Sequence, residues 1–177
     1  MSGKIIMNLA MSLDGYIADP NGGYDWIQGD GHKDLDTLAQ MDFDHFLKGI
    51  DIIVMGRKAY EDTPMEPFKE KMIYVATSKE IPYTPNLKAI HENLVAEVVK
   101  QRDLYHKNIY LFGGGLSIDG FLKADQVDEI IIGIVPIILG KGRRLFLEDN
   151  PRFLLKLDKY SVTDGMMILH YVRRNRN

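Results

Sequence analysis

The fold is decided by residues 108–117, which read Asn108-Ile109-Tyr110-Leu111-Phe112-Gly113-Gly114-Gly115-Leu116-Ser117. An apolar run, typical of a buried strand, ends in a run of glycines and continues as an amphipathic pattern typical of a helix. Glycine lacks a Cβ, so the backbone can approach a ligand closely, while the free N–H groups of a helix start point at its phosphates. The segment indicates a nucleotide site; a tight turn without a ligand is the alternative. It is not the G-x-G-x-x-G fingerprint, because Ile118 stands at the third glycine position.

The composition predicts one globular domain over residues 1–177. The chain has 177 residues, 45% of them hydrophobic, which suffices for one well-buried core. A net charge of -3 gives no electrostatic reason to bind nucleic acid or an anionic membrane. Cysteine is absent, which suits a reducing compartment. No apolar run reaches the ~18 residues of a membrane span. We therefore expect a cytoplasmic protein.

Strand and helix patterns alternate along most of the chain, which predicts an α/β sheet with parallel crossovers. The expected strands are 4–11, 51–55, 72–76, 108–112 and 127–135, and the expected helices are 33–48, 93–105 and 116–124. The end of the chain differs, because the β-rich runs 154–162 and 166–173 are joined by Thr163-Asp164-Gly165, a strong hairpin signal. The sheet should therefore be mixed, with an antiparallel C-terminal edge.

Unusual residues follow the expected strands, where open α/β sheets bind their ligands. The first strand runs into Ser12-Leu13-Asp14-Gly15-Tyr16. Gly56-Arg57-Lys58 follows the second, opens a short helix-like segment and suits a diphosphate. Thr77-Ser78-Lys79 follows the third and offers two hydroxyls and a cation to a monophosphate. Turns, helix caps and surface charge are the alternatives for each segment.

In this order the motifs resemble the dihydrofolate reductase-like superfamily over nearly the whole chain. The motifs are Ala10–Ile17, Asp25–Ile27, Val54–Glu61, Ala76–Lys79 and Leu111–Gly115. Ser12–Gly15 and Pro136–Phe146 resemble more closely the reductase domain of the bifunctional riboflavin-biosynthesis deaminase–reductase. The resemblance implies a three-layer fold with a mixed central sheet, helices on both faces and a C-terminal antiparallel hairpin.

The resemblance also implies NADPH as the cofactor. Gly56 and Arg57, with the glycine run, would hold its diphosphate, Thr77-Ser78-Lys79 its 2′-phosphate, and the end of the first strand its nicotinamide. The glycine run would also allow the unusual peptide geometry that the family shows. The expected cofactor residues are Ala10, Gly15, Tyr16, Ile17, Gly56, Arg57, Lys58, Thr77, Ser78, Lys79, Phe112, Gly113, Gly114, Gly115 and Leu116.

At the position of the proton donor, this sequence differs from dihydrofolate reductases. Dihydrofolate reductases hold the pterin with an acidic residue of the first helix, and an ungapped count back from Gly56 puts Gln40 there. An amide cannot donate a proton as a carboxylic acid does. Asp36 and Asp44 lie one turn to either side in the expected helix. Asp14 is the catalytic candidate, with a turn-forming Asp-Gly pair as an equally weighted alternative.

Met11 and Trp26 are, with Asp36 and Gln40, the expected substrate contacts, and a core role is the alternative for the tryptophan. The five histidines show no metal-ligand spacing. The leading hypothesis is an NADPH-dependent reductase of a small heterocycle, similar to 5-amino-6-(5-phosphoribosylamino)uracil reductase. A dihydrofolate reductase and a non-catalytic NADP-binding protein are the alternatives. The aliphatic region 127–139 and the C-terminal hairpin predict a homodimer.

Overall fold

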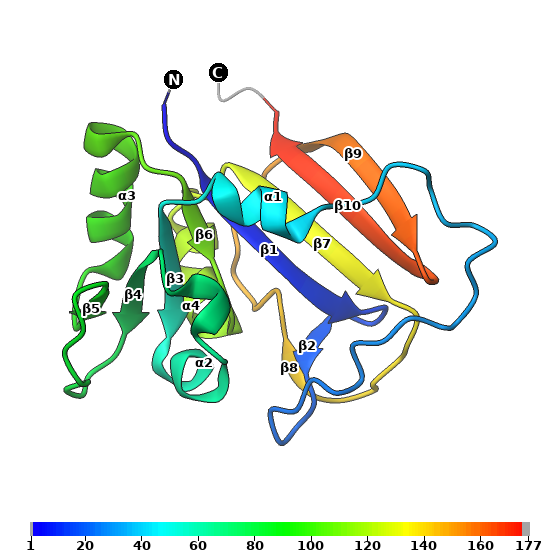
Figure 1. The fold of residues 1–177 in the computed structure, drawn as a ribbon, viewed down its shortest axis with the longest axis horizontal. Coiled ribbons are helices and arrows are strands. Elements are labelled where there is room, and N and C mark those ends of the chain that lie inside the picture. Colours follow the sequence, from blue (N-terminus) through cyan, green and yellow to red (C-terminus); the bar gives the residue numbers. More distant parts are fainter. Residues whose placement is uncertain (1, 175–177) are drawn as a thin grey trace.

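The computed structural model describes residues 2–174, apart from the side chain of Leu116, and these residues are arranged around one large sheet (Figure 1). Its strands are β1 (Ile5–Ser12), β3 (Ile52–Gly56), β4 (Met72–Ala76), β5 (Leu87–Ile90), β6 (Ile109–Leu111), β7 (Glu129–Val135), β9 (Leu155–Thr163) and β10 (Met166–Arg173). A second sheet pairs β2 (Tyr16–Ala18) with β8 (Arg143–Arg144). The helices are α1 (Phe43–Lys48), α2 (Arg57–Asp62), α3 (Leu94–Tyr105) and α4 (Gly115–Lys123), with a 3-10 turn at Glu66–Phe68.

The large sheet is mixed, as the sequence predicts. Its strand order is β5-β4-β3-β6-β1-β7-β10-β9. The strands from β5 to β7 pair in parallel, whereas β10 is antiparallel to both β7 and β9. Asp164 and Gly165 at the tip of the β9–β10 hairpin have φ angles of +50° and +73°. Positive φ at both central residues is what a type I′ hairpin turn requires, so the Asp-Gly signal is confirmed.

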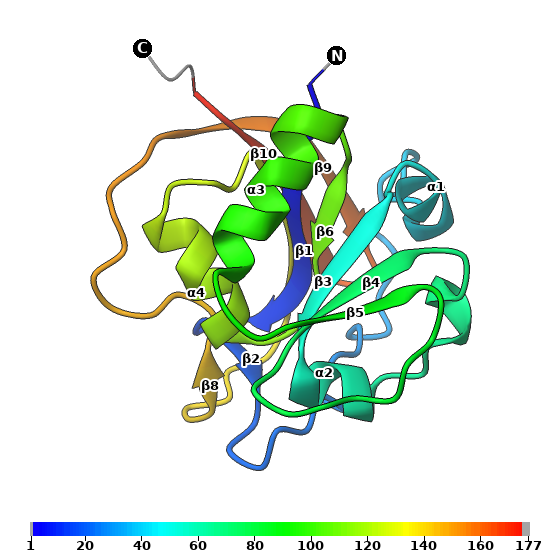
Figure 2. The ribbon, with the colours of Figure 1, turned by 90° about the vertical axis from the view of Figure 1, so that its left-hand side faces the viewer.

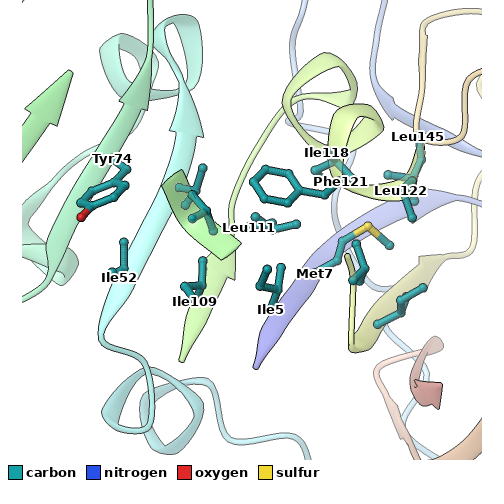
Figure 3. Close-up of a cluster of buried hydrophobic side chains, with 14 of the residues drawn as sticks. Ile5, Met7, Ile52, Tyr74, Ile109, Leu111, Ile118, Phe121, Leu122 and Leu145 are labelled. Atoms are coloured by element: carbon teal, nitrogen blue, oxygen red, sulfur yellow. The ribbon is translucent and has the colours of Figure 1, made fainter. Parts of the chain in front are cut away.

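Helices cover both faces of the sheet (Figure 2). The first buried cluster packs β1, β3, β6 and β7 against α3 and α4 through Val98, Phe121 and Leu122 (Figure 3). The second cluster lies on the opposite face, where Leu47 of α1 and Tyr60 of α2 join side chains of β3 and β4. Strands covered on both faces read as continuous apolar runs, which is why β3 and β7 could be found from hydrophobicity alone. The predicted three-layer architecture, with a mixed central sheet, helices on both faces and a C-terminal antiparallel hairpin, is confirmed.

The predicted helix over 33–48 is wrong for most of its length. Only Phe43–Lys48 is helical, and the carboxylate of Asp42 caps it by accepting a 2.9 Å hydrogen bond from the backbone N–H of His45. The apparent helical spacing used Leu35 and Leu38, whose side chains are 81% and 106% exposed. They pack on nothing that would stabilise a helix. No helix within residues 2–174 is long and apolar enough to cross a membrane.

Candidate functional site

The glycine run after β6 lies where three backbone segments meet at the carboxyl ends of the parallel strands. A Cβ on Gly113, whose φ is +98°, would lie 2.8 Å from the Cβ of Ala59 in α2. A Cβ on Gly115 would lie 2.9 Å from the carbonyl oxygen of Arg144 in β8. Gly113 and Gly115 are therefore required by close packing. A Cβ on Gly114 would meet no atom within 4 Å, so this glycine borders open space.

Gly56 has a similar role at the end of β3. A Cβ there would lie 3.0 Å from the Oγ of Ser117 in the first turn of α4, so the two strand-to-helix turns lie side by side. Gly114 is the N-cap of α4, and no side chain of the described residues caps this end. The first N–H groups of a helix lack intrahelical partners and carry partial positive charge. The junction therefore presents free donors beside a gap. All peptide bonds in residues 2–174 are trans.

Cations surround this junction. Arg57 starts α2, and its guanidinium donates a 2.6 Å hydrogen bond to the half-exposed Glu61. A Cβ on Gly22 would lie 3.1 Å both from Lys58 Nζ and from a guanidinium nitrogen of Arg143, so these two charges gather against the loop after β2. Three cationic side chains near a helix start favour an anionic ligand.

A cavity of about 790 Å³ opens between α3 and α4 beside the junction. It extends from Ala76 at the end of β4 to Ser117 and Gly120 of α4, and Asn93 and Leu94 line it at the start of α3. Its volume is in the range of small-molecule sites. Sequence reasoning missed the α3 residues, because nothing in their local pattern separates a cavity wall from an ordinary helix start.

The three residues of the loop after β4 have different roles: Thr77 is structural, whereas Ser78 and Lys79 are exposed. Thr77 is buried, and its hydroxyl accepts from the backbone N–H of Lys79 at 3.0 Å and donates to the carbonyl oxygen of Lys79 at 3.1 Å. Thr77 therefore forms the turn, which is the alternative weighed for it. Ser78 and Lys79 are exposed next to Ala76, which lines the cavity, so these two side chains can reach a phosphate.

Asp14 ties two loops together. Its carboxylate accepts hydrogen bonds from the Ser12 hydroxyl at 2.7 Å, from Leu139 N–H at 3.1 Å and from Gly140 N–H at 2.8 Å. The bond from Ser12, reinforced by those from Leu139 and Gly140, holds the pKa of Asp14 below its ordinary value. An ionised carboxylate with these partners fixes the loop after β7, which favours the turn-forming alternative over proton donation.

The other residues expected near the nicotinamide come from β1 and β2. Ala10 and Met11 alternate along β1, so their side chains point to opposite faces, and Met11 packs against the first cluster. Gly15 turns the chain with a φ of +89°. Tyr16 is buried beneath the guanidinium of Arg144, which lies 5.0 Å from its ring centroid. Ile17 Cδ1 would be 4.0 Å from a Cβ on Gly115, so β2 borders the glycine run.

Asp36 and Gln40, which are predicted near the place of the pterin-binding acidic residue, lie against the β9–β10 hairpin. The Gln40 amide donates to the carbonyl oxygens of Thr37 at 2.5 Å and Val162 at 2.9 Å, and Asp36 accepts from Asp164 N–H at 2.6 Å. These bonds hold the loop 33–42 to β9 and to Asp164 at the tip of the β9–β10 hairpin. The idea that Asp36, Gln40 and Asp44 share a helical face is wrong, because of the three only Asp44 is in a helix. The ungapped count back from Gly56 therefore does not identify an acidic residue that could hold a pterin.

Trp26 is half-buried, and its indole N–H donates to the carbonyl oxygen of Gly23 at 3.2 Å. Because the bond lies within one loop, it fits the alternative that Trp26 anchors this loop. The exposed part of the ring remains accessible to a substrate. In the part of the chain that the structure describes, no three His, Asp or Glu side chains are placed to hold a metal ion.

Two relatives match this chain over nearly its whole length, one by sequence and one by structure. The uncharacterized protein YwjB of Bacillus subtilis is 31% identical over 98% of this chain and 99% of its own. A candidate riboflavin biosynthesis protein from Shewanella sp. PV-4 superposes with a TM-score of 0.78 at 28% identity, over 99% of this chain and all of that one.

More distant structures share the fold. A diaminohydroxyphosphoribosylaminopyrimidine deaminase/5-amino-6-(5-phosphoribosylamino)uracil reductase from Thermotoga maritima has a TM-score of 0.70 at 16% identity, over 98% of this chain and 57% of that one. Dihydrofolate reductase from Enterococcus faecalis, in a complex with NADP(H), has a TM-score of 0.61 at 16% identity and 99% coverage of both chains. Residues 3–169 match the RibD C-terminal domain, and the chain therefore belongs to the RibD C-terminal domain family.

Proposed function

We propose that this protein is an NADPH-dependent reductase of a small heterocyclic substrate, similar to 5-amino-6-(5-phosphoribosylamino)uracil reductase. The observation that carries the proposal is the junction at the carboxyl ends of the strands. There Gly56, Gly113 and Gly115 let two helix starts and β8 meet, while Gly114 faces open space. The membership of the RibD C-terminal domain family supports the same chemistry.

The residues at the junction fit a phosphorylated dinucleotide. The N–H groups at the start of α4, together with Arg57, would hold the diphosphate, and Ser78 and Lys79 would hold the 2′-phosphate. The cavity between α3 and α4 suits the adenosine half. Lys58 and Arg143 add positive charge on the other side. When bound, the cofactor supplies a hydride. The protein's part is to position the two reactants and exclude water.

Four residues are proposed for the reacting end of the site. Ala10 leaves room beside the end of β1 because its side chain is small, and Tyr16-Ile17 closes the space next to the glycine run. The half-buried ring of Trp26 shields this end from water. Asp14 is a positioning residue in this proposal, because its ionised carboxylate holds the loop that follows β7.

The decisive experiment measures NADPH consumption. The purified protein is mixed with NADPH and, in turn, 5-amino-6-(5-phosphoribosylamino)uracil, its dephosphorylated form and dihydrofolate, and the loss of NADPH absorbance is followed. We expect turnover with an aminouracil and little with dihydrofolate. Brisk dihydrofolate reduction would favour the dihydrofolate reductase alternative. Tight NADPH binding without turnover of any compound would favour the non-catalytic NADP-binding alternative, and absence of NADPH binding would contradict the proposal altogether.

We also propose a homodimer formed through the β9–β10 hairpin. Leu157, Tyr160 and Met167 point to the same face of the sheet as Tyr171 and Leu169 in the pairing register, and are 46%, 63% and 44% exposed. The helices α3 and α4 cover the other half of the sheet (Figure 1). An uncovered apolar face of this kind is typical of an interface. The isoleucines of β7 contribute less than the sequence predicts, because residues 130–132 are buried within the protomer.

A further inference from the structure

Asn8 carries an amide nitrogen that the fold does not use. Its Nδ2 atom is buried and has no hydrogen-bond partner among the described residues. Side chains alternate along β1: Met7 joins the first cluster and Ile6 the second, so Asn8 lies on the face of Ile6, which α1 partly covers. The residue as a whole is partly exposed. Because a buried donor without a partner is unfavourable, the amide requires an explanation outside the chain's own packing.

The fold also gives no structural reason for a glycine at position 133 in the neighbouring strand β7. A Cβ there would find its nearest atoms, in Ala10 and Ile168, at 3.9 and 4.0 Å, an ordinary contact distance, and its φ is not positive. The fold therefore has room for a side chain at this position. Glycine inside a strand weakens it and often marks the close approach of a ligand.

These residues form one patch. Asn8 pairs with Ile131 and Ala10 with Gly133 in the parallel register of β1 and β7, so all four lie on one face. Figure 1 looks onto this face: α1 crosses the beginning of β1 and β7, and no described helix crosses their carboxyl-terminal halves. Small residues lie next to the partly exposed Asn8, so the surface there is low. The unpaired amide nitrogen is itself covered, and a rotation of the Asn8 side chain brings it to a ligand on this surface. A flat ring with a hydrogen-bonding edge matches this combination.

We propose that Asn8 recognises the amide edge of the heterocyclic substrate, its adjacent N–H and C=O groups, and that Gly133 keeps the strand face low enough for the ring to reach it. A carboxamide presents a donor and an acceptor side by side, so it can make two hydrogen bonds to such an edge, as asparagine does with adenine. Uracil and pterin rings both carry an amide edge. The inference rests on the proposed function, because that function supplies the heterocycle.

The position of Asn8 favours the substrate over the nicotinamide carboxamide. The cavity assigned to the nucleotide lies between α3 and α4, which pack on the face of the first cluster. Asn8 shares the opposite face with Ala10 but precedes it by two residues along β1, so it lies farther from the glycine junction at the strand ends. The amide edge that reaches Asn8 therefore belongs to the second ligand.

The test uses two variants and a matched control. Asn8→Leu removes the amide at similar size, Gly133→Ala fills the low surface, and Gly49→Ala is the control, since a Cβ there would meet its nearest atom at 3.5 Å and its φ is −81°. Calorimetry on the NADP⁺-loaded protein gives the Kd of 5-amino-6-(5-phosphoribosylamino)uracil and of dihydrofolate, and titration of the unliganded protein gives the Kd of NADPH. Thermal unfolding of the unliganded protein gives Tm.

We expect Asn8→Leu and Gly133→Ala to keep or raise Tm while the Kd of the pyrimidine rises about tenfold or more, the worth of one hydrogen bond made inside a site. The Kd of NADPH and all values of Gly49→Ala should stay unchanged. Unchanged pyrimidine Kd in both variants overturns the inference, and so does a rise confined to NADPH. A wild-type protein that binds NADPH but neither heterocycle also overturns it. Pyrimidine binding that depends on Asn8 but leads to no turnover supports it and contradicts the reductase proposal instead.

Discussion

The three consecutive glycines 113–115 provide a test that separates packing from ligand binding, because each has a different environment. Gly113→Ala would force a side chain into a φ of +98° and place its Cβ 2.8 Å from that of Ala59. Gly114→Ala would introduce a methyl group at a φ of −70° and a ψ of 153°, which any residue adopts, with no atom within 4 Å. The two neighbouring substitutions should therefore have opposite consequences.

The expected loss for Gly113→Ala follows from these two features. A non-glycine residue in such a backbone conformation costs about 1–3 kcal/mol. Carbon atoms prefer separations of about 3.5–4.0 Å, so α2 must also move by nearly 1 Å, at a further cost of about 1–3 kcal/mol. The sum is about 2–6 kcal/mol. In a chain of this size each kcal/mol lowers Tm by about 2–4 °C, so a fall of at least about 4 °C is expected.

Gly114→Ala should leave Tm almost unchanged. Alanine restricts the unfolded chain, which stabilises the protein by about 0.4–1 kcal/mol, and a slightly poorer helix cap offsets this gain. If the open space at Gly114 receives a diphosphate, the added methyl group should nevertheless weaken NADPH binding by about tenfold.

Circular dichroism melting of the unliganded proteins measures the first effect, and fluorescence titration with NADPH the second. Equal loss of stability in the two variants would refute the packing argument. Normal NADPH affinity of a folded Gly114→Ala protein would refute the placement of the diphosphate.

Four further predictions concern the charged and apolar side chains. Lys79→Ala should reduce the preference for NADPH over NADH by about tenfold in a binding titration, and an unchanged ratio would remove Lys79 from the 2′-phosphate site. Arg57→Ala should weaken both cofactors alike without lowering Tm, because its exposed ion pair contributes little; selective loss of one cofactor would contradict this. Glu129 accepts hydrogen bonds from His170 and Lys4, which hold its pKa at about 2 against an ordinary 4.5, so the stability it contributes is full above pH 4.5 and is lost as pH falls toward 2. The free energy of unfolding of Glu129→Gln should therefore fall less steeply than that of the wild type between pH 4.5 and 2. Identical pH profiles of the two proteins would contradict a stabilising role of the ionised Glu129. Tyr160→Glu should convert a dimer to a monomer in light scattering, whereas a wild-type monomer at micromolar concentration would end the dimer proposal.

The sheet could be predicted from the sequence because burial leaves a local mark. β3 and β4 are continuous apolar runs since helices cover both of their faces, and β7 is apolar where Ile130, Ile131 and Ile132 are buried. The Asp-Gly turn defines the hairpin by its backbone conformation. The segment 33–42 could not be predicted in this way. Its leucines repeat at helical spacing, but the segment is held by β9 and the hairpin turn, for example by the bond from Thr37 N–H to the Val162 carbonyl oxygen. A tertiary contact with a strand more than a hundred residues away leaves no periodic signal.

The two halves of the candidate site differ in the same way. The expected cofactor half depends on backbone approach, and close approach demands glycine at fixed places, so Gly56 and the run after β6 are recognisable in the sequence itself. Recognition of a ring depends instead on which side chains of adjacent strands share a face, and that is fixed by register. Asn8 and Gly133 belong to no motif in the sequence, and they acquire a role only when β1 pairs with β7 and brings both to the side that α1 leaves open. On this proposal, the specificity of the protein can change by single substitutions on β1 and β7 while the glycine motifs stay the same, because the strand pairing and the helix starts do not depend on those side chains.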